Sequence, residues 1–436
     1  MNSGVERSVP SESKLETFPD KPSGSARPGR YRIDSIDLLR GIVMVIMMLD
    51  HTRDFVHNAA LQFNPVDPTR TNVALFFTRW VTHFCAPVFV FLAGTGTFLQ
   101  FARGKSKREL SQFLIKRGLW LILLEITVIR LGVSFSFDPW LLAILQVIWV
   151  IGVSMILLAL LIHLPLRVIG VFGVGLILFH NLLDGFRVQS WLGPNSPVPG
   201  LGAKLWIVLH QGFEVFPVAG FPSPVVFVIY PLIPWVGVMA AGYAFGFFYQ
   251  KDYLTRRRLL IMVGVFAVAA FVILRAWNAY GDPDPWSKQR SGLFTVLSFL
   301  NTTKYPPSLL FLLMTLGPAI LALAWFESSS SQPEASSIWG KLRKAIIVFG
   351  RVPLFFYVLQ WFTAHLISVG LHLAFGKPVA WLFQTPLEWP NTPSGTGFNL
   401  GVVYLSWIIG ILLLYPACKW FAGIKQRRRD WWLSYL

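Results

Sequence analysis

The chain has 436 residues, of which 54% are hydrophobic and only 14% are charged, whereas a soluble protein carries about 25% charged residues. This composition, with a mean hydropathy of +0.56, excludes a large soluble domain and predicts an integral membrane protein. The net charge is +17. Because the basic residues form short clusters between apolar segments, we attribute this charge to membrane topology and not to nucleic-acid binding.

Composition divides the chain into three parts. Residues 1–30 are rich in serine, proline and charge, which predicts a disordered cytoplasmic tail and not a cleaved signal peptide. Residues 31–425 form the predicted transmembrane domain, and 426–436 form a basic cytoplasmic tail. Within the domain, "ESSSSQPEASS" (327–337) has the composition of a flexible linker.

The fold class that we predict is all-α: a polytopic membrane bundle of about ten helices, each needing about 20 apolar residues to span the bilayer. The predicted spans are 36–57, 73–101, 112–131, 139–162, 165–183, 223–249, 257–279, 305–326, 345–374 and 398–422. Clustered lysines and arginines fall on one side, which places both termini in the cytoplasm. No internal repeat is visible, unlike in many secondary transporters.

The first predicted span carries ionisable residues, each of which costs roughly 2.5–3.5 kcal/mol at the bilayer centre on insertion scales. At 100° per residue, one face of this helix collects Asp37, Arg40, Met44, Met47, His51 and Asp54. Asp50 lies at the edge of this stripe, and Arg53 points away from it. We expect the stripe to face the bundle interior or a wet cavity, and the apolar remainder to face lipid.

Arg40 and His51 are about 16 Å apart along a helix, so they cannot form one ion pair. The pattern predicts an anion-binding cation near the cytoplasmic end and a titratable imidazole deeper in the membrane. The plainer alternatives are that Arg40 extends to the lipid headgroups and that His51 is a satisfied histidine at a helix end.

Three further candidate groups fall inside the second and third spans: Arg79, His83 and Glu125. Arg79 and His83 are four residues apart and share a helix face, and His83 lies at a depth similar to that of His51. Glu125 in the third span needs a partner, for which Arg79, His83 and Arg130 are candidates. A structural ion pair and a catalytic role are both open for Glu125.

Later segments add fewer candidates. In the ninth span, Arg351 lies near the cytoplasm and His365 toward the outside, with function and structure equally plausible for the histidine. Lys304 is either at the outer mouth of a site or a loop anchor. We assign no role to His57, His163, His180 and His210, and expect His372 to be interfacial. The two cysteines, Cys85 and Cys418, suggest neither a disulfide nor a metal site, and no metal is predicted.

Several blocks of the sequence resemble known acyltransferases. Arg40 followed after ten residues by His51 is similar to the Arg-to-His signature of the acyltransferase-3 type. A closer resemblance is to a bacterial family related to heparan-alpha-glucosaminide N-acetyltransferase. It rests on the blocks "IDLLRGIVMVIMMLDHTRDF", "THFCAPVFVFLAGTG", "RGLWLILLE", "YPLIPWVGVMAAGYAFG", "KYPPSLLFLLMTLGP" and "GRVPLFFYVL", which together cover most of the chain from Arg32 to Lys425.

This resemblance implies an enzyme of the cell membrane, in bacteria the inner membrane. It would take acetyl-CoA or another acyl-CoA as co-substrate from the cytoplasm, without a permanently bound cofactor. The acceptor would be a saccharide or similar amine or hydroxyl compound on the far side. The implied catalytic residue is His51, oriented by Asp50 or Asp54, although the resemblance does not exclude His83. Arg40 would bind the donor, and Arg351 and Arg103 could assist it.

One departure concerns Gln360, because related sequences often have a histidine in this "FYVLH" position. If that histidine matters, the resemblance implies weakened or altered activity. The alternative functions are a transporter for a small anion or saccharide and a catalytically inactive assembly partner. The oligomeric state is open, and a homodimer is compatible with the sequence.

Overall fold

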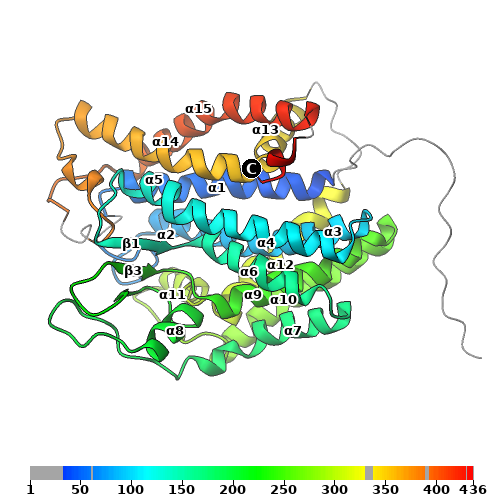
Figure 1. Cartoon of the computed structure of the whole chain (residues 1–436). Coiled ribbons are helices and arrows are strands. Elements are labelled where there is room, and N and C mark those ends of the chain that lie inside the picture. Colours follow the sequence, from blue (N-terminus) through cyan, green and yellow to red (C-terminus); the bar gives the residue numbers. More distant parts are fainter. Residues whose placement is uncertain (1–32, 60–61, 329–336, 388–391, 429, 436) are drawn as a thin grey trace, which may run out of the picture. The chain divides into compact units, whose positions relative to one another are not determined.

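Helices dominate the structure, as the long apolar segments predict (Figure 1). It is a computed structural model and describes residues 33–59, 62–328, 337–387, 392–428 and 430–435. The predicted disordered tail and nearly all of the predicted linker lie outside these residues. Asp34–Leu436 forms one unit, to which the following description applies.

The first half of this unit contains α1 (Asp34–Val56), α2 (Val73–Trp80), η1 (Val81–Phe84), α3 (Cys85–Ala102), α4 (Lys107–Leu124), the π-helix η2 (Glu125–Ile129), α5 (Arg130–Ser134), β1 (Leu141–Leu145), α6 (Val147–Leu161), α7 (Leu166–Phe179), η3 (His180–Leu183), α8 (Leu201–Leu209), β2 (Glu214–Pro217) and β3 (Val225–Val228). The second half contains α9 (Leu232–Phe245), η4 (Gly246–Gln250), α10 (Tyr253–Trp277), α11 (Gly292–Leu300), α12 (Leu309–Ser328), α13 (Ile338–Arg351), α14 (Pro353–Ala374), η5 (Ala380–Phe383), α15 (Leu400–Arg427) and η7 (Trp431–Ser434).

Seven helical segments within the described residues are long and apolar enough to cross a membrane. They are 73–102, 166–183, 232–250, 253–277, 309–327, 353–374 and 400–427. The other three predicted spans, 36–57, 112–131 and 139–162, are also largely helical. The first corresponds to α1, which is rich in charged residues. The second lies in a continuous helical segment over 107–134, and the third contains α6, which has 15 residues. The predicted ninth span is two helices, because the chain breaks at Val352, before Pro353 begins α14.

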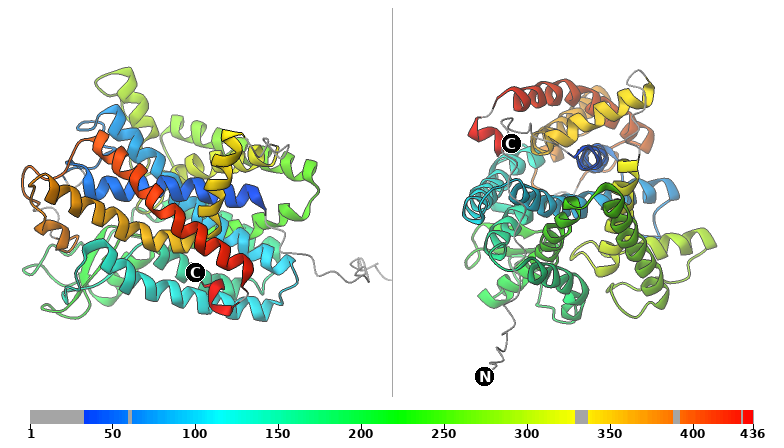
Figure 2. Two further views of the ribbon diagram at one scale, coloured as in Figure 1. Left: turned by 90° about the horizontal axis from the view of Figure 1, so that it is seen from above. Right: turned by 90° about the vertical axis from the view of Figure 1, so that its right-hand side faces the viewer.

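Helix α1 is enclosed by other helices and does not face lipid over a broad apolar side. It contacts α3 and α12 as well as α13, α14 and α15, and the right-hand view of Figure 2 shows it end-on with helices around it. Apolar residues off the polar stripe, such as Leu39 and Met48, are buried. The expectation that this side contacts lipid was therefore wrong, because α13 to α15 cover it.

The contact between α1 and α13 depends on two glycines. A Cβ on Gly41 would lie 2.0 Å from the carbonyl oxygen of Ile346, and one on Gly350 would lie 1.8 Å from that of Asp37. Real Cβ atoms do not approach backbone oxygens so closely. The absence of both side chains is therefore what lets the two backbones touch, as is common between membrane helices.

We expect Gly41→Ala to destabilise the protein by about 1–3 kcal/mol, the usual range for overpacking, because the backbone of α13 cannot yield like a flexible side chain. Gly370→Ala in α14 is the matched control, since a Cβ there meets nothing within 4 Å. Thermal unfolding in detergent measures both. Equal midpoints for the two variants would contradict the close approach of α1 and α13.

A small sheet lies at one end of the bundle, so the all-α prediction is incomplete. Its strand order is β1-β3-β2, with β1 parallel and β2 antiparallel to β3. Strands β1 and β3 occupy the starts of the predicted spans 139–162 and 223–249. Because they are parallel, their carboxyl ends meet at one edge, where Leu145 pairs with Val228. Helices α6 and α9 begin just beyond that edge.

Candidate active site

A small cavity lies beyond the carboxyl ends of β1 and β3. Gln146 is the residue between β1 and α6, and Tyr230 lies between β3 and α9; both line this cavity. The backbone N–H groups of Ile229 and Tyr230 each donate to the carbonyl oxygen of Leu145, at 3.1 Å. The parallel pairing therefore brings together two polar side chains that are 84 residues apart in sequence.

The remaining wall of the cavity comes from α1, η1, α3, α14 and the segment before α12. Its volume is about 40 Å³, and its complete lining is Met47, Asp50, His51, Thr82, Cys85, Ala86, Phe89, Gln146, Val147, Tyr230, Lys304 and Tyr357. Hydroxyl, amide, ammonium, carboxylate and imidazole groups thus converge on one narrow space. Because these groups converge there, we take this cavity as the candidate active site.

His51 is held in this wall by aromatic rings. Its imidazole stacks on Trp361 with centroids 3.7 Å apart and planes inclined by 22°, and Tyr357 lies edge-on at 6.4 Å. Its Nδ1 is buried without a hydrogen-bond partner among the described residues. Stacking therefore fixes the ring plane and leaves Nδ1 available to a ligand or a proton.

The neighbouring carboxylates neutralise arginines. Arg79 Nη1 donates to both oxygens of Asp50 at 2.6 Å. Arg53 Nη2 lies 3.0 Å from Asp50 Oδ1 and also donates to Asp54. No hydrogen bond joins either carboxylate to His51 among the described residues, and the ring stacks on Trp361 instead. Arg53, predicted to point away, is only 2% exposed.

Lys304 adds a third cation to this region. Lys304 lines the cavity and is 9% exposed. The carboxylates described above are those of Asp50 and Asp54. Lys304 and Asp50 line the cavity itself, and Arg53 and Arg79 pair with Asp50 beside it. Because Arg53 and Arg79 already neutralise Asp50, the charge of Lys304 favours a negative group in the cavity. Fixed positive charge of this kind stabilises the oxyanion that develops during acyl transfer, and does so more strongly where water is excluded.

The segment that carries Lys304 is held by Arg275 and Asp282. The Arg275 guanidinium donates to the carbonyl oxygens of Ser298, Phe299, Asn301 and Asp284. The Asp282 carboxylate accepts from the backbone and hydroxyl of Thr303 and, at 2.6 Å, from Ser308. Burial raises the pKa of Asp282, although these hydrogen bonds oppose it. The loop that approaches the cavity is therefore well ordered.

Glu125 finds a partner that the sequence did not suggest. Its Oε2 accepts from the backbone N–H groups of Ile148 and Trp149, at 3.1 and 3.0 Å, at the N-terminus of α6. A helix N-terminus leaves these donors unsatisfied and attracts a carboxylate. The expected partners Arg79, His83 and Arg130 are therefore incorrect, and Glu125, 0% exposed, fixes the helix that begins at the cavity.

We expect Glu125→Ala to destabilise the fold, because two buried N–H groups would lose their acceptor, at about 1–3 kcal/mol each. Ser106→Ala is the comparison: it removes an exposed cap at the start of α4, which is worth about 1 kcal/mol. Thermal unfolding of the two variants should rank them clearly. A Glu125→Ala protein as stable as Ser106→Ala would refute the capping role.

The other predicted histidines do not line this cavity. His83 is buried beside the ring of Phe311, at 5.4 Å between centroids. His365 stacks on Phe135 at 3.9 Å, and its Nδ1 lies 3.1 Å from the Gly132 carbonyl oxygen. His372, expected at the interface, is fully buried and bonds to Ser368 and Gly397. Among His51, His83, His365 and His372, only His51 lines the cavity.

Gln360 is buried one turn from Tyr357 on α14. Its exposure is 0%, and neither its amide oxygen nor its amide nitrogen has a hydrogen-bond partner among the described residues. It does not line the cavity. A buried amide without partners is uncommon.

The predicted donor-side cations lie toward the other end of α1. Arg40 Nη2 donates to the Leu92 carbonyl oxygen at 2.8 Å, and its Nη1 is 3.8 Å from Asp37. Arg351 approaches Asp34 and Asp37 at 3.9 Å. The structure therefore brings Arg40 and Arg351 around one carboxylate. Arg103 is exposed at the end of α3.

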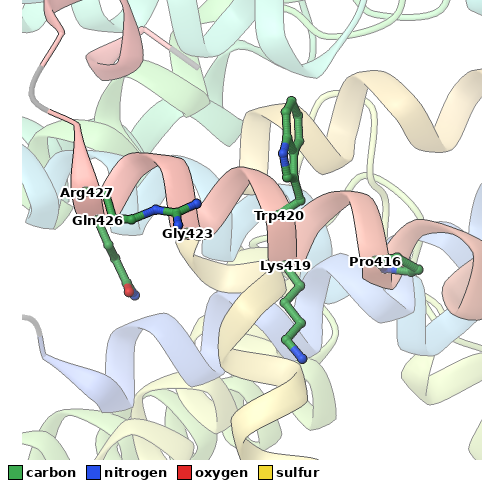
Figure 3. A pocket seen from close by; sticks show the side chains of 6 residues that line it. All are labelled: Pro416, Lys419, Trp420, Gly423, Gln426 and Arg427. Atoms are coloured by element: carbon green, nitrogen blue, oxygen red, sulfur yellow. The ribbon is translucent and has the colours of Figure 1, made fainter.

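A larger hollow of about 570 Å³ lies elsewhere, on the surface of α15 (Figure 3). All six lining residues come from that helix: Pro416, Lys419, Trp420, Gly423, Gln426 and Arg427. None of the buried polar groups described above contributes to it. A large volume alone does not indicate a catalytic site, so the smaller cavity remains the candidate active site.

Sequence reasoning missed the aromatic part of the site. Trp361, Tyr357, Tyr230 and Tyr305 are not among the site residues predicted from the sequence. Tyr305 packs against Tyr230 with ring centroids 5.1 Å apart. In a chain with 15% aromatic residues, no single tyrosine or tryptophan is distinctive, and the one available signal was the spacing of Tyr357 and Trp361 by four residues.

Fold and site together define a class of protein: a helical membrane protein with a buried, polar, histidine-containing cavity. Residues 32–277 match the family model described as heparan-alpha-glucosaminide N-acetyltransferase, catalytic. Because the match covers more than half of the chain, the protein belongs to this family and is an N-acetyltransferase-type membrane enzyme. No curated protein matches the chain significantly. The matched region ends with α10, so Lys304, Tyr357 and Trp361 lie beyond it.

Proposed function

We propose that the protein transfers an acetyl group from acetyl-CoA on the cytoplasmic side to an amine of a saccharide at the opposite side of the membrane. The observation that carries this proposal is that His51 borders the polar cavity with a stacked ring and a buried Nδ1 that has no hydrogen-bond partner in the described part of the chain. The family indicates the reaction class. The distribution of lysine and arginine supports an orientation with both termini in the cytoplasm, in a bundle for which we propose about ten spans.

His51 acts as the general base in this proposal. The acceptor nitrogen attacks the thioester carbonyl carbon while the imidazole takes the proton of the amine. Lys304 stabilises the oxyanion. When the carbon–sulfur bond breaks, the imidazolium returns its proton to the departing thiolate, giving the amide and free CoA. A two-step route through an acetyl-histidine has the same balance of atoms.

In this proposal, acetyl-CoA binds at the opposite end of α1. Arg40 and Arg351 would contact the phosphates of acetyl-CoA, with Arg103 beyond them. Between Arg40 and the cavity, the polar stripe of α1 is filled by Met44 and Met47, which are 1% and 5% exposed. The thioester arm must pass these side chains. Methionine is flexible and adapts to irregular neighbours, so displacement of the two side chains would open the route.

A transport assay in proteoliposomes distinguishes this function from carriage of a solute. Labelled acetyl-CoA is supplied on the side of the chain termini, and glucosamine is supplied on the other side. An acetyltransferase places the label on glucosamine without moving either CoA or glucosamine across. Passage of unmodified glucosamine, with no label transferred, would refute the proposal and favour a carrier.

A further inference from the structure

Three side chains with metal-ligating atoms converge away from the candidate active site. They are His180 at the start of η3, Asp184 just after η3, and His210 at the end of α8. One ligand atom from each lies within 4.8 Å of those of the others. His210 Nε2 is 3.1 Å from Asp184 Oδ1, and the two imidazole centroids are 5.7 Å apart.

Burial and missing hydrogen bonds set this cluster apart from an ordinary ion pair. Both histidines are 2% exposed. Neither ring nitrogen of His180 has a hydrogen-bond partner among the described residues, and the same holds for Nδ1 of His210. Buried polar atoms normally find partners. A His210–Asp184 pair alone leaves His180 unexplained, whereas a shared ion would use its free nitrogen.

The donor set suits a particular class of ion. Two imidazoles and one carboxylate form a nitrogen-rich site of the kind that binds Zn²⁺, with a fourth position open to water. Ligand atoms around a tetrahedral zinc ion lie about 3.4 Å apart, given bonds of about 2.0–2.2 Å. Small side-chain rotations would close the present separation.

A supporting residue orients the carboxylate. Asn181 Nδ2 donates to Asp184 Oδ2 at 2.7 Å, which leaves Oδ1 directed at the imidazoles. Asn181 Oδ1 accepts from the backbone N–H of Leu309 at 2.9 Å. Partners of this type around metal ligands hold them in position and tune affinity.

We propose that His180, Asp184 and His210 bind a divalent transition-metal ion, with zinc as the expected occupant. The ion joins the end of the α7–η3 segment to the end of α8, across the connection of residues 185–200. Through Asn181 and Leu309 it also braces the start of α12, next to the loop that carries Lys304. Its role is structural, and it takes no part in the acetyl transfer proposed above.

Metal content tests the proposal without any activity measurement. The full chain is purified in detergent, stripped with a chelator, reloaded with Zn²⁺ and desalted, and metal is counted by mass spectrometry. We expect one ion per chain in the unaltered protein and a higher unfolding temperature with zinc than without it. Co²⁺ in place of zinc should give the strong visible absorption of a tetrahedral site.

The variants His180→Gln and His210→Gln should lose the bound ion and the zinc-dependent rise in unfolding temperature. His163→Gln is the matched control, because this exposed histidine lies outside the cluster and contacts Ser111; it should retain the ion. Asn181→Ala should weaken binding by about 10–100-fold. Unfolding temperatures of the metal-free proteins show whether each variant folds.

Either of two results overturns the proposal. One is that the unaltered protein binds no stoichiometric zinc and shows no cobalt spectrum, which needs no variant at all. The other is that zinc content and the thermal shift are the same in His180→Gln as in His163→Gln, since the metal would then be held elsewhere on the chain.

Discussion

Replacing His51 by alanine is expected to reduce acetyl transfer by about 10²–10⁴-fold, the contribution of a general base. The fold should persist, because Nδ1 has no hydrogen-bond partner among the described residues, and the ring loses its stacking on Trp361 and its edge contact with Tyr357, each worth about 0.5–1.5 kcal/mol for a ring pair. The measurement is the rate at which label from acetyl-CoA appears on the acceptor.

Three further variants separate chemistry from packing. His51→Phe keeps a ring against Trp361 but has no nitrogen, so it should be as inactive as the alanine variant. His163→Ala should retain normal turnover, because His163 lies away from the cavity. His83→Ala tests the alternative left open by the sequence. If it abolishes turnover while His51→Ala remains active, the catalytic assignment moves to His83.

Removing the carboxylate of Asp50 is expected to produce the largest loss of stability. Asp50→Ala leaves Arg79 and Arg53 buried near the membrane interior without their shared partner. Breaking a buried pair in this way costs about 3–5 kcal/mol, because a charge remains uncompensated. Thermal unfolding in detergent should show a midpoint far below that of the unaltered protein.

The matched control for this prediction is Asp430→Ala. Asp430 approaches Arg428 at 3.9 Å, but the two side chains are 44% and 68% exposed, and pairs of this kind contribute at most about 1 kcal/mol. If the two alanine variants unfold at similar temperatures, Asp50 does not stabilise the fold by compensating the charges of Arg79 and Arg53.

The position of the site along the chain could be predicted from α1 alone. Ionisable residues inside a bilayer must face protein or water, so a helix with Arg40, Asp50 and His51 had to border something polar. The direction of Arg53 could not be predicted, because a helical wheel assumes one lipid-facing side. Helix α1 has none, since α13, α14 and α15 enclose it.

The sheet illustrates a different limit. Leu141–Leu145 and Val225–Val228 are short apolar runs directly followed by apolar helices, and hydropathy cannot separate a buried strand from the first turns of a helix. Glu125 caps α6 at this strand-to-helix junction, so its hydrogen bonds could not be predicted from the sequence either. A contact between helices far apart in sequence, such as His51 with Trp361, carries no local signal.

The central place of α1 has a consequence for biosynthesis. The ribosome makes α1 well before α14, because Trp361 follows His51 by 310 residues, which takes about 15–60 s at about 5–20 residues per second. During that interval, Asp50 has counter-charges in Arg53 of the same helix and in Arg79, which is made soon afterwards, but His51 lacks the ring on which it stacks. We therefore expect chains that terminate before α13 to be recognised by membrane proteases, even when every earlier helix has been synthesised correctly.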